Sequence, residues 1–412
     1  MNISRKIRKA CGEDPVLAAI SEAAAQCGSE LHLVGGYLRD LLCGKPTRDV
    51  DFLLRGNPDR FLKSIARRGK GRVMTFRKEG ITNHRIRIGE RFCDFVELAP
   101  GTEVRRELAR RDFTVNSLAW NLHAEELLDP FHGLDDLRAK RLRAIGPKTF
   151  AVDPLRILRG IRIAAELKRF TIAPATRRQM TAARDRLGSI PVERIREEID
   201  RILLSGQAEP GLRRMREIGV LFPLFPELEP METTMQAQRQ SVLDHTLRVV
   251  GLAERWPRLG RTFFLEEQPE PEEILVLLYA ALFHDLGKPA AHKKDPDGSI
   301  HFYGHERISR TLTAGISRRM RFPGKRAARI ERLALHHLRA GWLTEGRPGE
   351  RALRRVIRDL EDDLPLLLLL SVADRKGSAP RGRAEDDRHR RICRSLYRMY
   401  RDSGSSILKP PR

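Results

Sequence analysis

The stretch that decides the fold of the N-terminal region is "LVGGYLRDLLCGKPTRDVDFLL", residues 33–54. It predicts a strand that ends at Gly35 and Gly36, then a short helix, then a second strand, "VDFLLRG". Asp49 and Asp51 are two residues apart, and such residues of a strand point to the same face of a sheet. Adjacent carboxylates stay ionised together when they are solvated or bridged by cations, and Mg²⁺ is the usual cation beside phosphate. Taken alone, such a pair is better explained by an edge strand with its polar face in water.

The neighbours of this pair favour a phosphate site over a plain edge strand. The two glycines remove side chains where a backbone must approach a ligand, and Arg39 follows them on the next helix, within reach of phosphate. A third carboxylate, Asp94, lies in the β-like segment "HRIRIGERFCDFVEL". Three carboxylates beside a glycine turn are the layout of two-metal phosphoryl chemistry.

The composition gives a large basic excess, with 78 Lys plus Arg against 55 Asp plus Glu and a formal net charge of +23. A length of 412 residues predicts two or more domains, and 41% hydrophobic residues argues against wholesale disorder. Arginine supplies most of the excess, and its planar fork matches phosphate oxygens. Nucleic acid is therefore the first partner to consider, although a merely basic protein has the same charge.

The cysteines and apolar segments favour a cytoplasmic protein without a membrane span. The five cysteines are scattered and form no CxxC pair, which is typical of reduced thiols. The first apolar stretch is broken by Glu22, which makes it a poor signal peptide. The run "LPLLLLLSVA" at 364–373 is about half the length that spans a bilayer, so it predicts a buried helix.

The pattern along the chain predicts an α+β fold with three parts. Strands and helices alternate to about residue 145, after which amphipathic helices such as "PVERIREEIDRILLSG" take over. A Pro-rich stretch at 222–234 marks a boundary, and the region beyond it is helical and rich in histidine. The predicted domains are a mixed-sheet head at 1–146, a helical neck and body at 147–232, and a helical domain at 233–412.

Five motifs in a fixed order resemble the class II nucleotidyltransferases, that is, the tRNA CCA-adding enzymes and the bacterial poly(A) polymerases. They are the opening stretch, "ARRDFTVNSLAW" (109–120), "LLDPFHGLDDLRAKRLRAIG" (127–146), "DPLRILRGIRIAAEL" (153–167) and "PVERIREEIDRIL". Together they cover roughly residues 30–230. The resemblance implies a polymerase-beta-like head that transfers nucleotides, with the helical neck and body holding tRNA through its backbone and shape.

For the head, the resemblance implies that Asp49 and Asp51 hold two Mg²⁺ ions, with Asp94 as the third carboxylate and Glu97 as the alternative. An RNA 3′-hydroxyl would attack the α-phosphorus of CTP or ATP and release pyrophosphate. The resemblance places three residues at the triphosphate: Gly35, Gly36 and Arg39.

In "RRDFT", the resemblance implies that Arg110, Arg111 and Asp112 handle the triphosphate and the ribose. A carboxylate that accepts from a 2′-hydroxyl selects ribonucleotides over deoxyribonucleotides. Without the neighbouring motifs, a helix N-terminus with a surface salt bridge would be the better explanation of this segment.

Asp153 and Arg156 are three apart on a predicted helix, so both should face the same way. The resemblance implies that they pair with the edge of C or A without a template. Val152 stands where the family has Glu. Arg159 and Arg162 continue the basic face, either supporting the site or adding only charge.

One departure bears on specificity. Between "CDFVEL" and "RRDFT" the chain has little more than "APGTEVRRELA". Complete CCA-adding relatives usually carry a longer loop here, and relatives that add only CC have a short one. A CC-adding enzyme is therefore a live alternative.

The histidine-rich region resembles the HD phosphohydrolase superfamily, whose pattern is H…HD…D. His245, His284, Asp285 and Asp374 match that pattern. His305 with His336 or His337 are the residues that a second metal would use. Mixed nitrogen and oxygen ligands suit a divalent transition metal more than Mg²⁺, and a metal-bound water would cleave phosphate esters. A relic site is the alternative.

The main prediction is template-independent addition of C and A to tRNA 3′ ends, with CTP and ATP as substrates and an HD hydrolase as a second activity. Three enzyme alternatives remain: a CC-adding enzyme, a poly(A) polymerase, and an HD phosphohydrolase with an inactive RNA-binding head. A basic RNA-binding protein without enzymatic activity would need neither the three carboxylates of the head nor the His and Asp residues of the C-terminal region. The oligomeric state is not predicted.

Overall fold

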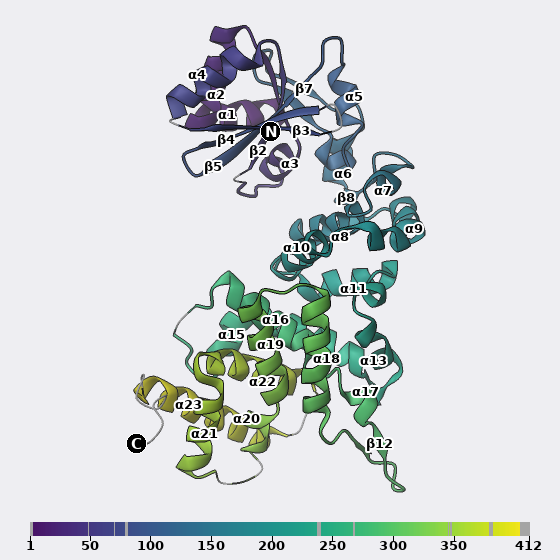
Figure 1. Ribbon diagram of the computed structural model, residues 1–412, viewed down its shortest axis with the longest axis vertical. Coiled ribbons are helices and arrows are strands. Elements are labelled where there is room, and N and C mark those ends of the chain that lie inside the picture. Colours follow the sequence, from purple (N-terminus) through teal and green to yellow (C-terminus); the bar gives the residue numbers. More distant parts are fainter. Residues whose placement is uncertain are drawn as a thin grey trace. The chain divides into compact units, whose positions relative to one another are not determined.

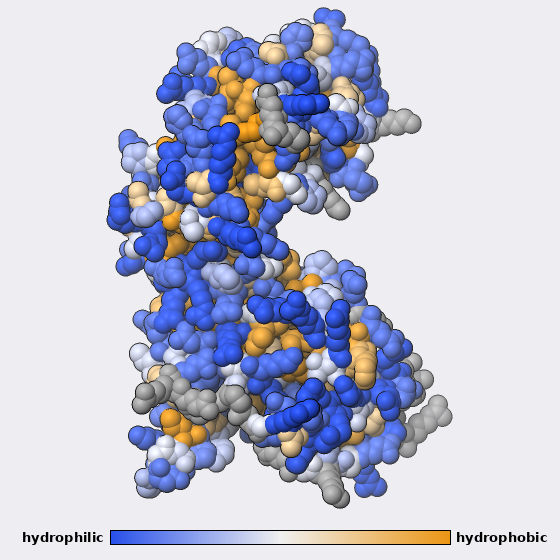
Figure 2. Space-filling model, turned by 180° about the vertical axis from the view of Figure 1, so that it is seen from behind, coloured by the Kyte–Doolittle hydropathy of each residue, from blue (hydrophilic) through white to orange (hydrophobic). Residues whose placement is uncertain are grey.

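The computed structural model describes residues 3–47, 49–69, 71–78, 81–236, 240–266, 268–344, 346, 348–378 and 382–403. It divides into two compact units, Met1–Gly160 with Arg169–Ala183, and Ile161–Lys168 with Arg184–Arg412. The first combines a mixed sheet with helices and the second is almost entirely helical, so the predicted α+β class is confirmed (Figure 1). Hydrophilic side chains cover most of the face in Figure 2, as the charge requires, with apolar ones between them.

The N-terminal unit is built on a seven-stranded sheet with the order β3-β4-β5-β2-β1-β6-β7. Strands β2 and β5 run parallel, and the other neighbouring pairs are antiparallel. The strands are β1 Glu30–Val34, β2 Val50–Arg55, β3 Val73–Lys78, β4 Ile81–Ile88, β5 Arg91–Glu97, β6 Ala119–Asn121 and β7 Glu126–Leu128. The two strands predicted from the opening stretch are therefore β1 and β2, and β2 lies directly beside the carboxylate-bearing β5.

The two faces of this sheet are packed differently. Side chains of α1 (Ile3–Glu13), α2 (Pro15–Cys27) and α4 (Pro58–Gly69) form a large core with one face, around the stacked rings of Phe52 and Phe95. The other face has a smaller cluster around Val34 and Leu53, to which α5 (Val104–Leu108) contributes. A sheet packed mainly on one face leaves polar groups of the other face available for a site.

The remaining helices follow the amphipathic segments of the sequence. In the N-terminal part they are α3 Gly36–Leu42, α6 Gly133–Arg138, α7 Thr149–Val152, α8 Arg156–Glu166 and α9 Pro174–Ala183. Beyond these lie α10 Val192–Leu203, α11 Ala208–Ile218, α12 Leu221–Leu224, α13 Glu229–Thr233, α14 Val242–Ala253, α15 Trp256–Gly260, α16 Pro271–Phe283, α17 Lys288–Ala291, α18 His305–Arg319, α19 Gly324–His336, α20 Arg339–Trp342, α21 Glu350–Leu360, α22 Leu364–Gly377 and α23 Arg383–Ser403. Helix α8 begins in the first unit and ends in the second.

The apolar helices of the second unit form its core. The run at 364–373 is the buried part of α22, as predicted. Among the residues that the structure describes, one segment, Pro271–Ala291, is long and apolar enough to cross a membrane. Its most apolar window is 72% buried inside the protein, as the core helix of a folded domain would be.

Candidate active sites of the two units

The head carboxylates lie where β2 and β5 run side by side. Strand β2 begins at Val50, so Asp49 directly precedes the strand in which it was expected, and its side chain is exposed. Asp51 is in register with Asp94 of the parallel strand β5. Cross-strand partners project from the same face about 5 Å apart, so Asp51 and Asp94 are neighbours.

The geometry separates Asp94 from the alternative, Glu97. Glu97 is three residues further along β5 and therefore points to the opposite face. There its Oε1 lies 2.5 Å from Nε2 of His84. Asp94 is thus the carboxylate of β5 that shares a face with Asp51.

Burial raises the pKa of the Asp51 carboxyl; nearby Arg111 lowers it, and the charges of Asp94 and Asp49 raise it further. Asp94 is held by Arg85, whose Nε and Nη2 each donate a 2.7 Å hydrogen bond to it. The cluster therefore has more negative charge than its burial favours, and an oxygen-only donor set of this kind fits Mg²⁺.

Gly35 is required by two features of this site. Its φ of +76° is favourable for glycine, and a Cβ at this position would lie 2.9 Å from Oδ2 of Asp51 and 3.3 Å from Nη1 of Arg111. At Gly36 a Cβ would lie 3.4 Å from Nη2 of Arg39. The glycine turn therefore lets the backbone approach the carboxylate itself.

Arg39, which was predicted to face the triphosphate, lies beside the glycine turn and is held there by protein partners. Arg39 is only 7% exposed and donates to both oxygens of Asp40, at 2.8 and 2.9 Å, and to Oδ1 of Asn116, at 2.7 Å. Asn116 in turn donates to Oδ1 of Asp112 at 2.7 Å. A buried guanidinium with three such bonds links α3 to the "RRDFTVN" segment.

The "RRDFT" residues surround this network. Asp112 is 5% exposed, its Oδ1 also accepts from the Phe113 backbone N–H at 2.8 Å, and its Oδ2 lies 3.5 Å from Nη1 of Arg159. Arg110 is exposed and pairs with Glu107 at 3.4 Å. Arg111, by contrast, lies beside Asp51, so the two arginines of the motif have different surroundings.

The prediction that Asp153 and Arg156 share one helical face is wrong. Asp153 ends α7 with an extended backbone, φ −143° and ψ 99°, and its Oδ1 accepts from the Leu155 backbone N–H at 3.1 Å. Pro154 explains the break, because a residue before proline avoids the helical region. Arg156 opens α8 and donates to the carbonyl oxygens of Arg110, at 2.7 Å, and Arg111, at 3.3 Å.

These contacts anchor Arg156 on the "RRDFT" backbone, and burial lowers the pKa of its guanidinium. Val152, at the position where the family has Glu, is the last residue of α7 and is 72% exposed. Asp153 and Arg156 are therefore close in the chain but are held by different groups.

Arg162 does not continue a basic face, which corrects that expectation. It is 6% exposed, and it donates to Glu198 at 2.7 Å and to both oxygens of Glu166 at 2.8 and 2.9 Å. Burial lowers the pKa of Arg162, but the two carboxylates raise it above its ordinary value. Because it lies on the buried side of the amphipathic helix α8, Arg162 is a structural ion-pair residue.

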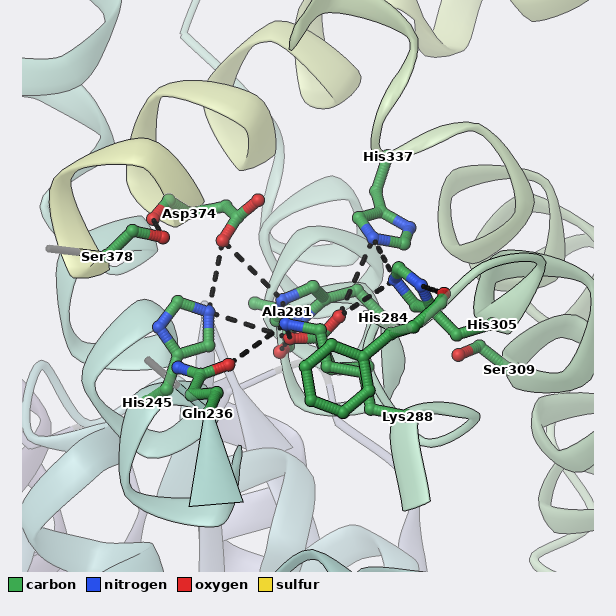
Figure 3. Close-up of polar contacts among 12 residues, drawn as sticks. Gln236, His245, Ala281, His284, Lys288, His305, Ser309, His337, Asp374 and Ser378 are labelled. Carbon is green, nitrogen blue, oxygen red and sulfur yellow. Dashed lines mark hydrogen bonds and ion pairs between the residues drawn. The ribbon is translucent and has the colours of Figure 1, made fainter. Parts of the chain in front are cut away.

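The second site brings together side chains from five helical segments of the C-terminal unit (Figure 3). The ligand atoms of His245, His284 and Asp374 lie within 4.8 Å of one another, as do those of Asp285, His305 and His337. Among the described residues these are the two groups of three that converge so closely. All the residues predicted from the H…HD…D pattern are therefore in one place.

Asp285 lies between the two groups. Its Oδ2 is 3.1 Å from Nε2 of His284 and 3.6 Å from Nε2 of His245, while its Oδ1 is 3.2 Å from Nε2 of His305 and 3.6 Å from Nε2 of His337. Each oxygen thus faces one group, so Asp285 could contribute a metal ligand to either group.

The imidazoles are oriented as metal ligands. The Nδ1 atoms of His284, His305 and His337 lie 2.8, 2.6 and 2.8 Å from the backbone carbonyls of Ala281, Phe302 and Ala334. An Nδ1–H that donates to a carbonyl leaves Nε2 with a free lone pair. Burial lowers the pKa of His337 to about 3, so it is neutral, as a ligand must be. Nε2 of His284 is buried and lies 3.1 Å from Oδ2 of Asp285.

His336 is the exception among the predicted residues. It lies outside both groups and is only partly buried, because adjacent residues of a helix point about 100° apart. Sequence reasoning also missed Lys288, whose Nζ lies 2.6 Å from Oδ2 of Asp285 and 3.0 Å from Oε1 of Gln236. Its place three residues after Asp285, one helical turn on, was the available signal.

Comparisons with known proteins match the regions of the chain that contain both candidate sites. Family models match the poly(A) polymerase head domain at residues 31–143, the probable RNA and SrmB-binding site of polymerase A at 169–232, and the HD domain at 242–376. The A-adding tRNA nucleotidyltransferase of Deinococcus radiodurans is 31% identical over 357 residues, which are 84% of this chain and 76% of the relative. The CC-adding enzyme of Thermus thermophilus is 33% identical over 353 residues, 83% of this chain and 75% of the relative.

A third relative, the multifunctional CCA protein of Azoarcus sp., is 32% identical over 309 residues, 71% of this chain and 69% of the relative. The solved structure of the Thermotoga maritima CCA-adding enzyme complexed with tRNA has the same fold, with a TM-score of 0.64 and 20% identity, covering 96% of this chain and 84% of that one.

The fold and the head site define a nucleotidyltransferase with a polymerase-type head. The chain belongs to the family of tRNA nucleotidyltransferases and poly(A) polymerases, and its C-terminal unit contains an HD domain.

Proposed function

We propose that this protein adds C and A to the 3′ ends of tRNA without a template, from CTP and ATP, and releases pyrophosphate. The register of Asp51 with Asp94, beside Gly35 and Arg111, is the observation that carries the proposal. The names of the relatives support it, because they include A-adding, CC-adding and multifunctional CCA enzymes.

Asp49, Asp51 and Asp94 are the residues that would hold Mg²⁺. When bound, Mg²⁺ activates the RNA 3′-hydroxyl and neutralises charge on the triphosphate. Arg111 is placed to hold a phosphate of the nucleotide next to these carboxylates. Oδ2 of Asp112, near Arg159, is the acceptor offered to the ribose 2′-hydroxyl.

Base selection is assigned to Asp153 and Arg156. The helix break at Pro154 separates them, so Asp153 ends α7 and Arg156 begins α8. Arg156 is fixed by two carbonyls of the motif that handles the nucleotide, so its guanidinium has a defined direction. A planar donor fork held in this way can discriminate C and A from the other bases.

The functional division of the chain is the head at 1–146, the neck and body at 147–232 and the HD domain at 233–412. The helical neck and body supply basic side chains for the tRNA backbone. Because its substrates are tRNA, CTP and ATP, the protein works in the cytoplasm, and its cysteines remain thiols.

A second function is proposed for the C-terminal unit, namely hydrolysis of phosphate esters at a two-metal site. The observation that favours it is Asp285, whose two oxygens face two separate groups of ligands. Four imidazoles suit a divalent transition metal, which would supply an activated water. Lys288 is positioned to neutralise a phosphate oxygen near Asp285.

The experiment is extension of tRNA transcripts that end before C74, after C75 and after A76, with each labelled nucleotide and Mg²⁺. Growth to CCA followed by a stop is the expected result. A stop at CC makes the protein a CC-adding enzyme that needs an A-adding partner, and long A tails make it a poly(A) polymerase. Absence of any extension overturns the proposal and leaves the HD site as the remaining activity.

A further inference from the structure

An open surface adjoins the head carboxylates on the same face of the sheet. Met74 of β3 is in register with Arg85 of β4, Arg85 with Asp94 of β5, and Asp94 with Asp51 of β2. These residues form one row across four strands, so Met74 stands three strand spacings, roughly 14 Å, from Asp51.

Two phenylalanines extend this row along the strands. Phe76 follows Met74 by two residues and Phe92 precedes Asp94 by two, so both share its face. Met74, Phe76 and Phe92 are 42%, 54% and 40% exposed. Helices α1, α2 and α4 pack on the opposite face of the sheet. Phe76 and Phe92 lie on opposite sides of the row, in register with Asn83 and Arg87 of β4. Large apolar side chains that are exposed on both sides of a charged row indicate a surface that binds a partner.

The charges around these side chains indicate which occupant fits. The Arg85 guanidinium lies 5.7 Å from the centre of the Phe92 ring while it binds Asp94, so it connects the aromatic surface to the carboxylates. Arg87 is the register partner of Phe92, and its side chain is exposed. Exposed rings alternating with arginines are the composition of single-stranded nucleic acid sites, where bases stack and guanidinium groups bind phosphates.

We propose that Met74, Phe76 and Phe92, the β3–β5 platform, stack the last bases of the RNA primer, while Arg85 and Arg87 bind its phosphates. The inference rests on the proposed function, because the primer 3′-hydroxyl must reach the metal held by Asp49 and Asp51. The nucleotides that precede this hydroxyl then need a surface on the same face. The row from Asp51 to Met74 provides apolar and arginine side chains across four strands.

The test is the full-length Phe76→Ala, Phe92→Ala double variant, assayed with a tRNA primer ending at C75. We expect the KM for tRNA to rise roughly 10- to 100-fold, as loss of one or two stacking contacts predicts, with the KM for ATP within about twofold of wild type. Phe76→Trp, which keeps a stacking surface, should preserve the wild-type KM for tRNA. Phe264→Ala is the matched control, because Phe264 is 60% exposed and belongs to the C-terminal unit.

A binding measurement separates this inference from the proposed function. A primer with 2-aminopurine as its last base should be quenched by wild-type protein and by Asp49→Ala, but much less by the Phe76→Ala, Phe92→Ala variant, whether or not extension occurs. Equal quenching by all of them overturns the platform. So does a wild-type dimer in sedimentation that the double variant dissociates, since the surface would then bind a second copy of the chain.

Discussion

The two candidate metal sites of this chain differ in how far their ligand side chains are already arranged before a metal or substrate binds. In the C-terminal unit, six residues point their ligand atoms inward, with Nδ1 atoms on backbone carbonyls and Asp285 between two groups. In the head, Asp49 is exposed and Asp94 is bound to Arg85. The difference indicates that the helical core holds its ligand residues in place in advance. The head site, in contrast, is completed only when the nucleotide and its cations bind.

The largest expected effect tests whether the two sites act separately. Asp49→Ala with Asp51→Ala should lower the rate of nucleotide addition by at least about 10³-fold, because the cation ligands beside the triphosphate are lost. Hydrolysis of a phosphodiester by the same preparation should stay within twofold of wild type. Asp59→Ala, which removes an exposed carboxylate from α4, is the control. Equal loss of both activities would break the comparison.

Metal content sharpens the description of the preformed site. Asp285→Ala should lose metal from both groups, because each of its oxygens faces one of them. His337→Ala should lose about one equivalent, and His336→Ala, its neighbour outside the groups, should lose none. Metal is counted by mass spectrometry on the full-length chain after dialysis. Full retention of one metal by Asp285→Ala would show that this carboxylate does not contribute a ligand to both groups.

Sequence reasoning identified the ligand types of both candidate sites but not the contacts of the supporting arginines. The pattern of ligand types in "DVD" and H…HD…D is local, so it could be predicted, as could the strands and helices that carry it. What Arg39 and Arg162 contact depends on long-range packing: Asn116 and Glu198 are distant in sequence. The break between Asp153 and Arg156 was predictable in principle, because Pro154 stands between them.

Arg162 provides an intermediate effect. Arg162→Met should destabilise the helical unit by roughly 3 kcal/mol, because Glu198 and Glu166 are left without their partner in a mostly buried place. The preference between CTP and ATP should not change. Urea unfolding followed by circular dichroism measures the first, and competition between the nucleotides measures the second. A changed nucleotide preference with unchanged stability would show that Arg162 acts in nucleotide binding and not in the stability of the unit.

The smallest effect concerns the stability of the head. The pKa of Asp51 is raised above 3.8, so the folded state binds this proton more tightly than the unfolded state, and the ionised carboxylate opposes folding at neutral pH. Asp51→Asn should therefore stabilise the metal-free protein by about 1 kcal/mol at pH 7 while abolishing addition. The gain should vanish below pH 3.8, where Asp51 is protonated in both states. Thermal unfolding across this pH range measures it, and destabilisation at pH 7 would contradict the crowded-carboxylate picture.

The most direct measurement of the central claim is restoration of each activity by different metals. The full-length protein is stripped with a chelator and then assayed for tRNA extension and for phosphodiester hydrolysis with Mg²⁺ alone, or with Mg²⁺ and a transition metal such as Ni²⁺ or Mn²⁺. We predict that Mg²⁺ alone restores extension but not hydrolysis, and that the transition metal restores hydrolysis. Restoration of hydrolysis by Mg²⁺ alone, or extension that requires the transition metal, would contradict the assignment of two chemically distinct sites.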